Sequence, residues 1–264
     1  MKIPRVVLVA AIGIAAAPVL RGEEQRGQPA ANPPATAKVA APIDLTGNWV
    51  SIVTEDWRWR MVTPAKGDYA SIPMTPAAKM VADAWDPAKD EAAGEQCRSY
   101  GTAAIMRVPG RLRITWQDDN TLKVETDAGM QTRLLHFGSW KGGQGAPTWQ
   151  GDSVASWELP GGAGRRGEGG EGTAAKAEPK FGNLKAVTTH MRPGYLRKNG
   201  VPYSADTKLT EYWDLYKDRS GDWLVITTLV DDPKYLQLQF VTSSNFKRER
   251  DGSKWDPTPC SARW

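Results

Sequence analysis

The sequence contains many short segments in which apolar and polar side chains alternate with a period of two. In residues 111–117, for example, Leu112, Ile114 and Trp116 all fall on one face. Such alternation is typical of a β-strand that buries one face and exposes the other. Strands are therefore predicted over residues 47–54, 57–60, 111–117, 121–126, 130–137, 153–159, 183–191, 208–216, 223–230 and 235–242, with a tight turn over 218–221.

One segment favours a helix instead. Thr75 suits an N-cap and Pro76 suits the first helical position, and residues 77–85 favour helix. The helix is expected to end at Asp86, because Pro87 follows it. Many short strands with one helix indicate an all-β barrel or sandwich rather than a parallel sheet with crossover helices.

The N-terminus has the layout of a secretory signal peptide. Lys2 and Arg5 precede an uncharged apolar run over 6–17, which ends in small residues. An uncleaved anchor is the alternative, but the run is shorter than the roughly 20 residues that span a bilayer. We therefore expect a signal peptide over 1–20, a disordered Pro- and Gln-rich tether over 21–42, and one domain over 43–264. Within that domain, the Gly-rich residues 160–182 are expected to form a flexible insertion.

Export sets the expected chemistry of the two cysteines. A signal peptide implies a periplasmic or secreted protein, and a Cys pair in an oxidising compartment favours a disulfide. Cys97 and Cys260 are therefore predicted to be bridged, and two unrelated buried thiols are the alternative.

Charge excludes some partner classes. The chain has 34 Lys and Arg against 30 Asp and Glu, a net charge of +4, and removal of Lys2 and Arg5 lowers it to +2. That excess is too small to indicate nucleic acid or an anionic membrane as partner. Residues after the signal show no second apolar stretch long enough for a membrane span.

A motif near the start of the domain resembles a known family. Residues 44–49 (DLTGNW) are similar to the G-x-W signature that opens the first strand of lipocalins and related calycins. The resemblance implies that Trp49 plugs the closed end of a barrel, and that Arg248 or Arg250 packs over it. Because this chain is longer, has more strands and carries its helix early, we expect an enlarged antiparallel calycin-like barrel with one short helix.

A second resemblance covers more of the chain. Residues 147–158, with their GDSV and WE blocks, and residues 188–203 are similar to uncharacterised secreted bacterial proteins. This resemblance implies no activity.

Candidate catalytic residues lie near the ends of predicted strands. His136 and His190 are the two histidines, and histidine is the usual acid or base near neutral pH. Glu211 shares a face with apolar residues, an odd position for a carboxylate unless it is paired. Together with Tyr195 these residues form a hypothetical catalytic group at a barrel mouth, where Arg192, Arg197 and Tyr203 suit a carboxylate or phenolate ligand. The alternative is that each residue caps a strand or forms a surface pair.

Twelve Trp residues suit an aromatic or apolar ligand, although core packing must explain most of them. The candidates for a cavity lining are those on predicted strands, namely Trp57, Trp59, Trp116, Trp157 and Trp213. Metal-ligand spacings and cofactor motifs are not found, so neither a metal nor a cofactor is predicted.

Three hypotheses for the function follow from these observations. The first is an exported β-barrel that binds a small, largely apolar or aromatic molecule. The second is a cofactor-independent lyase, hydratase or isomerase on the same scaffold, acting through His136 and His190 with Glu211 or Tyr195. A surface interaction module is the third. Whether the protein is an enzyme stays open from sequence alone.

Overall fold

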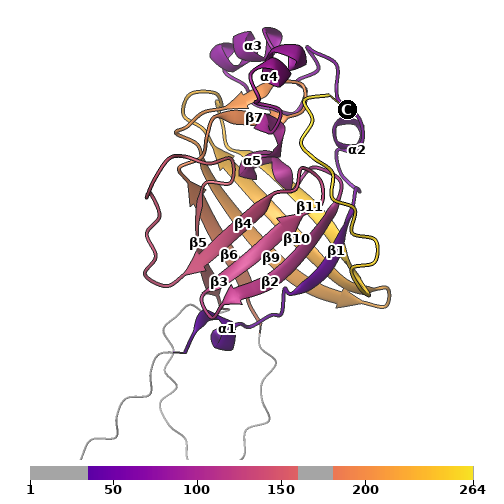
Figure 1. Cartoon of the computed structure of the whole chain (residues 1–264), viewed down its shortest axis with the longest axis vertical. Coiled ribbons are helices and arrows are strands. Elements are labelled where there is room, and N and C mark those ends of the chain that lie inside the picture. Colours follow the sequence, from indigo (N-terminus) through magenta and orange to yellow (C-terminus); the bar gives the residue numbers. More distant parts are fainter. Residues whose placement is uncertain (1–34, 160–180, 264) are drawn as a thin grey trace, which may run out of the picture. The chain divides into compact units, whose positions relative to one another are not determined.

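The computed structural model describes residues 35–159 and 181–263, and it confirms the all-β prediction. Nine strands close into a barrel in the order β1-β11-β10-β9-β6-β5-β4-β3-β2, with β2 pairing back to β1 (Figure 1). The expected signal peptide and most of the expected tether and Gly-rich insertion lie outside the described residues.

The barrel strands are β1 (Gly47–Ile52), β2 (Arg111–Asp118), β3 (Thr121–Thr126), β4 (Thr132–Phe137), β5 (Asp152–Glu158), β6 (Asn183–Thr189), β9 (Lys208–Asp218), β10 (Gly221–Asp231) and β11 (Phe240–Glu249). A separate hairpin pairs β7 (Gly194–Arg197) with β8 (Val201–Tyr203). The predicted turn over 218–221 joins β9 to β10.

The sequence predicted an antiparallel barrel, and the structure corrects this prediction at one pair of strands. β4 and β5 run parallel, whereas every other neighbouring pair of barrel strands is antiparallel. Geometry requires this exception, because strands of alternating direction cannot close into a ring of nine without one pair that points the same way. The long connection over 138–151 carries the chain back to the end from which β4 starts, and so permits the parallel pair.

The expectation of one helix was too low. The described helices are α1 (Ala37–Ala40), α2 (Trp57–Arg60), α3 (Pro76–Asp83), α4 (Pro87–Ala92), the 3₁₀ turn η1 (Arg98–Tyr100) and α5 (Thr102–Ile105). α3 is the predicted helix, with Thr75 as its N-cap. Asp86, where the predicted helix was expected to end, begins a second helix, because its side chain accepts a hydrogen bond from the Ala88 amide and caps α4.

Two predicted strands were placed wrongly. Residues 57–60 form the helical turn α2, because Asp56 turns the backbone (φ 51°) and Arg60 is pulled inward to buried acceptors. The strand predicted over 235–242 begins only at Phe240 and continues to Glu249. The amides of residues 234 and 235 instead donate to the Asp232 carboxylate, which holds a turn there. Some buried positions of β11 carry small polar residues, so this strand lacks a clear alternation of apolar and polar side chains.

Folded structure also begins earlier than Ile43, so the predicted tether boundary at residue 42 is wrong. α1 lies at the lower end of the barrel (Figure 1). The Trp157 indole donates to the Ala37 carbonyl at 2.8 Å, and the Ala37 amide donates to the Asn120 side chain at 2.9 Å. These bonds attach the segment to β5 and to the β2–β3 turn.

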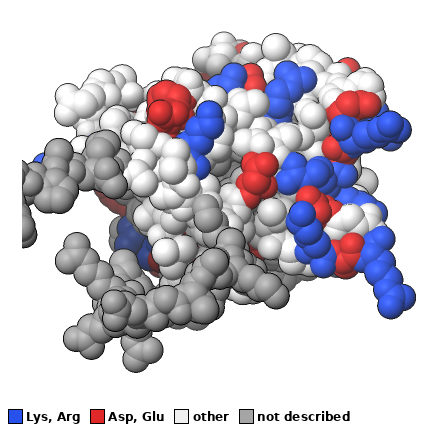
Figure 2. Space-filling model, turned by 90° about the horizontal axis from the view of Figure 1, so that it is seen from below, with Lys and Arg blue, Asp and Glu red and all other residues white. Residues whose placement is uncertain are grey.

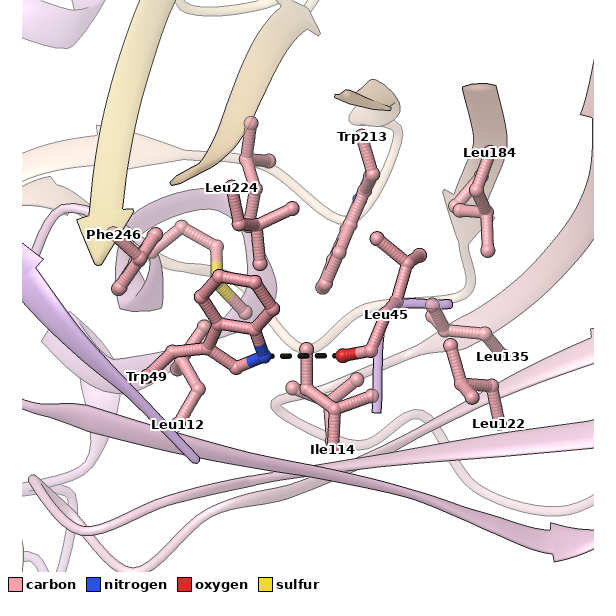
Figure 3. Packing of buried hydrophobic residues seen from close by; sticks show 14 of the residues in the cluster. Leu45, Trp49, Leu112, Ile114, Leu122, Leu135, Leu184, Trp213, Leu224 and Phe246 are labelled. Atoms are coloured by element: carbon pink, nitrogen blue, oxygen red, sulfur yellow. Dashed lines mark hydrogen bonds between the residues drawn. The ribbon is translucent and has the colours of Figure 1, made fainter. Parts of the chain in front are cut away.

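The barrel interior is filled by one apolar cluster (Figure 3). Trp49 and Trp213 are its largest members, and both are fully buried. The Trp49 indole donates to the Leu45 carbonyl at 3.0 Å, which satisfies its polar atom inside the core. Because side chains of Leu, Ile, Trp and Phe meet across the interior, the barrel is a packed core rather than an open container.

The contact expected over Trp49 is present, and Arg248 makes it. The Arg248 guanidinium lies 4.2 Å from the Trp49 ring, bonds the carbonyls of Asp44 and Thr46, and pairs with Asp222 at 2.9 Å. A Cβ atom at Gly47 (φ 127°) would approach the guanidinium to 2.5 Å, so the Gly of the motif provides room for this cation. Arg250, the other candidate, is exposed.

The predicted disulfide is confirmed. Cys97, just before η1, is bonded to Cys260 in the segment after β11. The bridge closes a loop of 163 residues and attaches the C-terminal segment to the upper helices.

Replacing Arg248 should open the lower end of the barrel. Arg248→Ala removes a cation–π contact and charged hydrogen bonds to carbonyls, so the free energy of unfolding should fall by about 2–3 kcal/mol. Urea denaturation measures the change. Arg250→Ala is the matched control and should stay within about 0.5 kcal/mol of the parent; equal effects of the two variants would contradict the assignment.

Loss of the disulfide should destabilise the whole domain. For a loop of this length the chain-entropy relation gives up to about 5 kcal/mol. We expect Cys97→Ser/Cys260→Ser to lower the urea midpoint accordingly. A reductant should lower the midpoint of the parent but leave that of the double variant unchanged.

Candidate functional site

Glu211 is enclosed in the barrel by a partner, Arg133. The two guanidinium nitrogens of Arg133 contact the two carboxylate oxygens at 2.5 and 3.1 Å, and both side chains are fully buried. This bidentate geometry is the strongest that the two groups can form. The pairing explains how a carboxylate can occupy a core position, and it leaves Glu211 remote from solvent.

The two histidines lie apart from this pair. His136 points outward from β4, whose neighbouring Leu135 and Phe137 point inward, and it stacks on Trp140 with ring centroids 4.0 Å apart. Burial lowers the pKa of His136, so the ring is neutral near pH 7. His190 follows β6 with φ 57° and bonds the Asp152 carboxylate at 2.9 Å. The charges of Asp118 and Asp152 raise the pKa of His136, but by less than burial lowers it.

Tyr195 belongs to a third group. Its hydroxyl donates to the Asp90 carboxylate at 2.9 Å and lies 3.1 Å from Arg98, which also pairs with Asp90. Burial, above all, raises the pKa of Tyr195 to about 12. Tyr195 therefore acts as a neutral donor that joins β7 to α4 and η1.

The remaining ligand candidates divide between packing and surface. Trp116 and Trp157 pack around Phe137, Trp213 is in the core, and Tyr203 is buried in a second cluster beneath the β7–β8 hairpin. Trp57 is 67% exposed. Arg192 pairs with Glu95 at 2.6 Å and lies over Trp149. The predicted residues that meet at a cleft are Trp59 and Arg197.

That cleft lies at the upper end of the barrel, where α2, η1, β7 and the segment in and just after α5 meet. Its walls include Trp59, Ser99 and four basic residues, Arg60, Arg107, Arg197 and Lys198. We call it the basic cleft. The cavity volume is about 20 Å³, which is enough for a bound water molecule.

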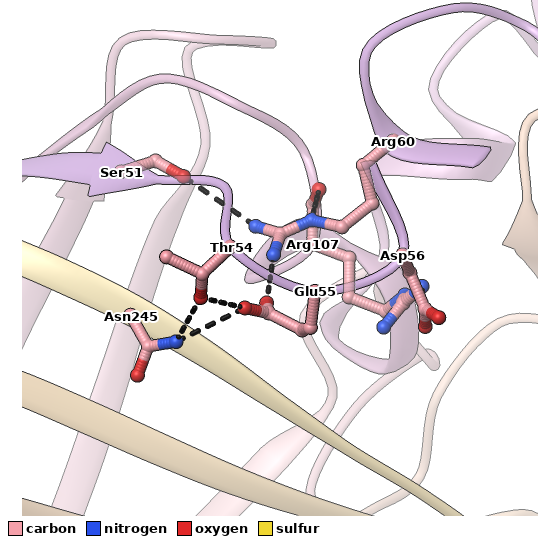
Figure 4. Close-up of polar contacts among 7 residues, drawn as sticks. All are labelled: Ser51, Thr54, Glu55, Asp56, Arg60, Arg107 and Asn245. Atoms are coloured by element: carbon pink, nitrogen blue, oxygen red, sulfur yellow. Dashed lines mark hydrogen bonds and ion pairs between the residues drawn. The ribbon is translucent and has the colours of Figure 1, made fainter. Parts of the chain in front are cut away.

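One wall of the basic cleft is a fixed polar network (Figure 4). Arg60 donates to the Arg107 carbonyl at 2.9 Å and forms an ion pair with Glu55. Glu55 in turn accepts hydrogen bonds from Thr54 and Asn245 at 2.6 and 3.0 Å. Burial lowers the pKa of Arg60 to about 10, so the guanidinium keeps its charge at neutral pH. The charge of Arg60 is thus balanced and its orientation is fixed.

Arg107 and Arg197 are less well balanced. Arg107 pairs with Asp56 at 2.8 Å through Nη2, while its buried Nη1 has no hydrogen-bond partner among the described residues. Arg197 bonds the Ala70 carbonyl at 3.0 Å and lies 4.9 Å from the Trp59 ring, and no described carboxylate forms an ion pair with it. The pKa of Arg197 is lowered to about 10, mainly by burial and to a smaller extent by the positive charge of Arg107. The cleft therefore carries excess positive charge.

Sequence reasoning found Trp59 and Arg197 but missed Arg60, Arg107 and Lys198. The three missed residues come from separate segments that meet only in the fold. Residues 57–60 did contain a usable signal. Their two Arg residues fit the exposed face of a strand, but they fit equally well a helical turn in which one Arg is buried.

Charge elsewhere on the described surface is mixed. Viewed from the lower end, Lys and Arg lie among Asp and Glu (Figure 2). Asp222, for example, pairs with both Arg248 and Lys217. Within residues 35–159 and 181–263, no three His, Cys, Asp or Glu are arranged to hold a metal ion. No helix in the same ranges is both long and apolar enough to cross a membrane.

Comparison with known proteins adds no assignment: no protein-family model matches the sequence, and no curated protein or solved structure matches it either.

Breaking the Arg133–Glu211 pair should destabilise the barrel severely. Glu211→Gln leaves a buried cation without its counter-charge, so the free energy of unfolding should fall by about 3–5 kcal/mol. Glu158→Gln removes an exposed carboxylate paired with Lys185 and should change it by less than about 1 kcal/mol. Arg133→Met/Glu211→Leu should recover much of the loss. A Glu211→Gln protein as stable as the parent would refute this structural role.

Proposed function

We propose that this protein is an exported β-barrel that binds a small aromatic or apolar molecule carrying an anionic group, and that the basic cleft is the binding site. The observation that carries the proposal is the buried Arg107 Nη1, which has no partner among the described residues, beside Arg197, with which no carboxylate of those residues forms an ion pair. Guanidinium groups in this state favour a carboxylate, because it supplies both the missing acceptor and the missing charge.

The apolar part of the ligand has a partner in Trp59. Its indole nitrogen bonds the Asp68 carboxylate at 3.2 Å, which fixes the ring at the cleft beside Arg197. A flat ring can pack on this indole while its carboxylate points toward the guanidinium groups. Since the cavity has room for little more than a water molecule, binding of such a ligand requires a shift of side chains at the rim.

The packed interior moves the proposed site away from the barrel core. Trp213 and Trp116, expected at a ligand cavity, pack against other side chains. The closed barrel, together with the Trp49–Arg248 contact, supports kinship with the calycins, and the Cys97–Cys260 bridge fits an oxidising compartment.

Acid–base catalysis is supported less well. Glu211 is bonded to Arg133 inside the barrel, Tyr195 to Asp90, and His190 to Asp152. These are three separate groups, so no shared substrate position connects them.

Affinity for aromatic carboxylates should depend on Arg197. We expect benzoate, phenylacetate or indole-3-acetate to bind with one-to-one stoichiometry in isothermal titration calorimetry, and the matching amides to bind at least about tenfold more weakly. Arg197→Gln removes a charged hydrogen bond worth about 1.5–3 kcal/mol, so the Kd should rise about 10- to 100-fold.

Arg219→Gln is the matched control, because it makes the same charge change at an exposed residue of the β9–β10 hairpin. Its affinity should equal that of the parent. The proposal fails if none of the three carboxylates binds, or if the Arg197 and Arg219 variants bind equally well.

A further inference from the structure

Lys198 is placed where it can react with a molecule in the basic cleft. It follows Arg197 directly at the end of β7, in the tight turn that leads to β8, and it forms part of the cleft wall. The residue is partly exposed, so a small molecule that enters the cleft can reach it. A carboxylate held by Arg197 therefore lies next to the residue that carries the amine.

We infer that Lys198 forms a reversible imine with a small aldehyde or keto acid whose carboxylate is held by Arg107 and Arg197. This inference rests on the proposed function, since it takes the basic cleft as the binding site. It narrows the ligand class to anions with a carbonyl group, above all 2-oxo acids, in which the carbonyl carbon is bonded directly to the carboxylate.

Burial in the cleft favours the neutral, nucleophilic form of the amine. Arg60 on α2, Arg107 after α5 and Arg197 on β7 all line the same cleft, and Asp56 and Asp68 offset part of their charge. Burial lowers the pKa of the Lys198 amine to about 6. At neutral pH most of the amine is therefore unprotonated, whereas an exposed lysine with a pKa near 10.4 is almost fully protonated.

The reaction is balanced without any oxidant or reductant. The nitrogen lone pair attacks the carbonyl carbon, a C–N bond forms, and the carbonyl oxygen takes up a proton to give a carbinolamine. The nitrogen loses one proton, the hydroxyl is protonated and leaves as water, and the resulting iminium loses the second nitrogen proton to give the neutral imine. One water is released for each imine, and hydrolysis reverses the sequence.

Reductive trapping tests the inference on the full chain. Glyoxylate, a small anionic aldehyde, is added with sodium cyanoborohydride at neutral pH, and the adduct is mapped by peptide mass spectrometry. We expect one adduct per chain, on Lys198, with a yield that falls as the pH drops below about 6, because the amine becomes protonated. Lys198→Met should abolish it, and Lys79→Met, a change at an exposed lysine of α3, should not.

Two results would overturn the inference: adducts spread over exposed lysines without enrichment at Lys198, or unchanged labelling of Lys198→Met. If that variant fails to fold, competition in the parent decides, since benzoate should protect Lys198 from labelling and its amide should not. If benzoate binds but glyoxylate is not trapped, the imine inference is refuted and the proposed function stands. If benzoate does not bind and glyoxylate is not trapped, both are refuted.

Discussion

The filled interior of the barrel is the constraint on which the remaining organisation depends. Trp49, closed in by Arg248, and Trp213, next to the Arg133–Glu211 pair, occupy volume that a ligand-carrying barrel would leave open. Interiors packed to this density do not admit a ligand without a cost comparable to that of core rearrangement. The proposed binding site therefore lies at the upper end, where short helices and the β7–β8 hairpin meet above the core.

Two groups of buried charges show how the same residue types serve different purposes. Arg133 and Glu211 neutralise each other through two hydrogen bonds in full burial, although the Arg133 Nε has no partner among the described residues. In the basic cleft, Arg60 is balanced by Glu55. Within the described part of the chain, Arg107 pairs with Asp56 but keeps one nitrogen without a partner, and Arg197 contacts backbone carbonyls and an indole but forms no ion pair. Because an uncompensated buried charge is costly, a cleft of this kind gains free energy from an anion that fits it, whereas the Arg133–Glu211 pair already carries its own counter-charge.

The sequence was sufficient for features that depend on local pattern. Alternation predicted most barrel strands, and Thr75–Pro76 predicted the start of α3. The resemblance at Gly47-x-Trp49 implied a basic residue over Trp49 but left Arg248 and Arg250 as equal candidates. Features set by closure or by distant contacts could not be read in this way. The parallel β4–β5 pair follows from an odd number of strands. The position of Arg60 depends on a carbonyl 47 residues away, and alternation in a four-residue segment does not separate a strand from a helical turn.

The basic cleft combines cations that respond differently to their surroundings. Burial lowers the pKa of Arg60 and Arg197 only to about 10, so both stay charged through the neutral range, whereas the same effect lowers the pKa of Lys198 to about 6. Part of the difference follows from the reference values, 12.5 for a guanidinium and 10.5 for a lysine amine, and the larger downward shift of the Lys198 pKa accounts for the rest. Guanidinium groups can thus supply lasting attraction for an anion, while the neighbouring amine is free of its proton. Binding and reactivity are in this way assigned to different side chains of a single cleft, and neither requires the barrel core to open.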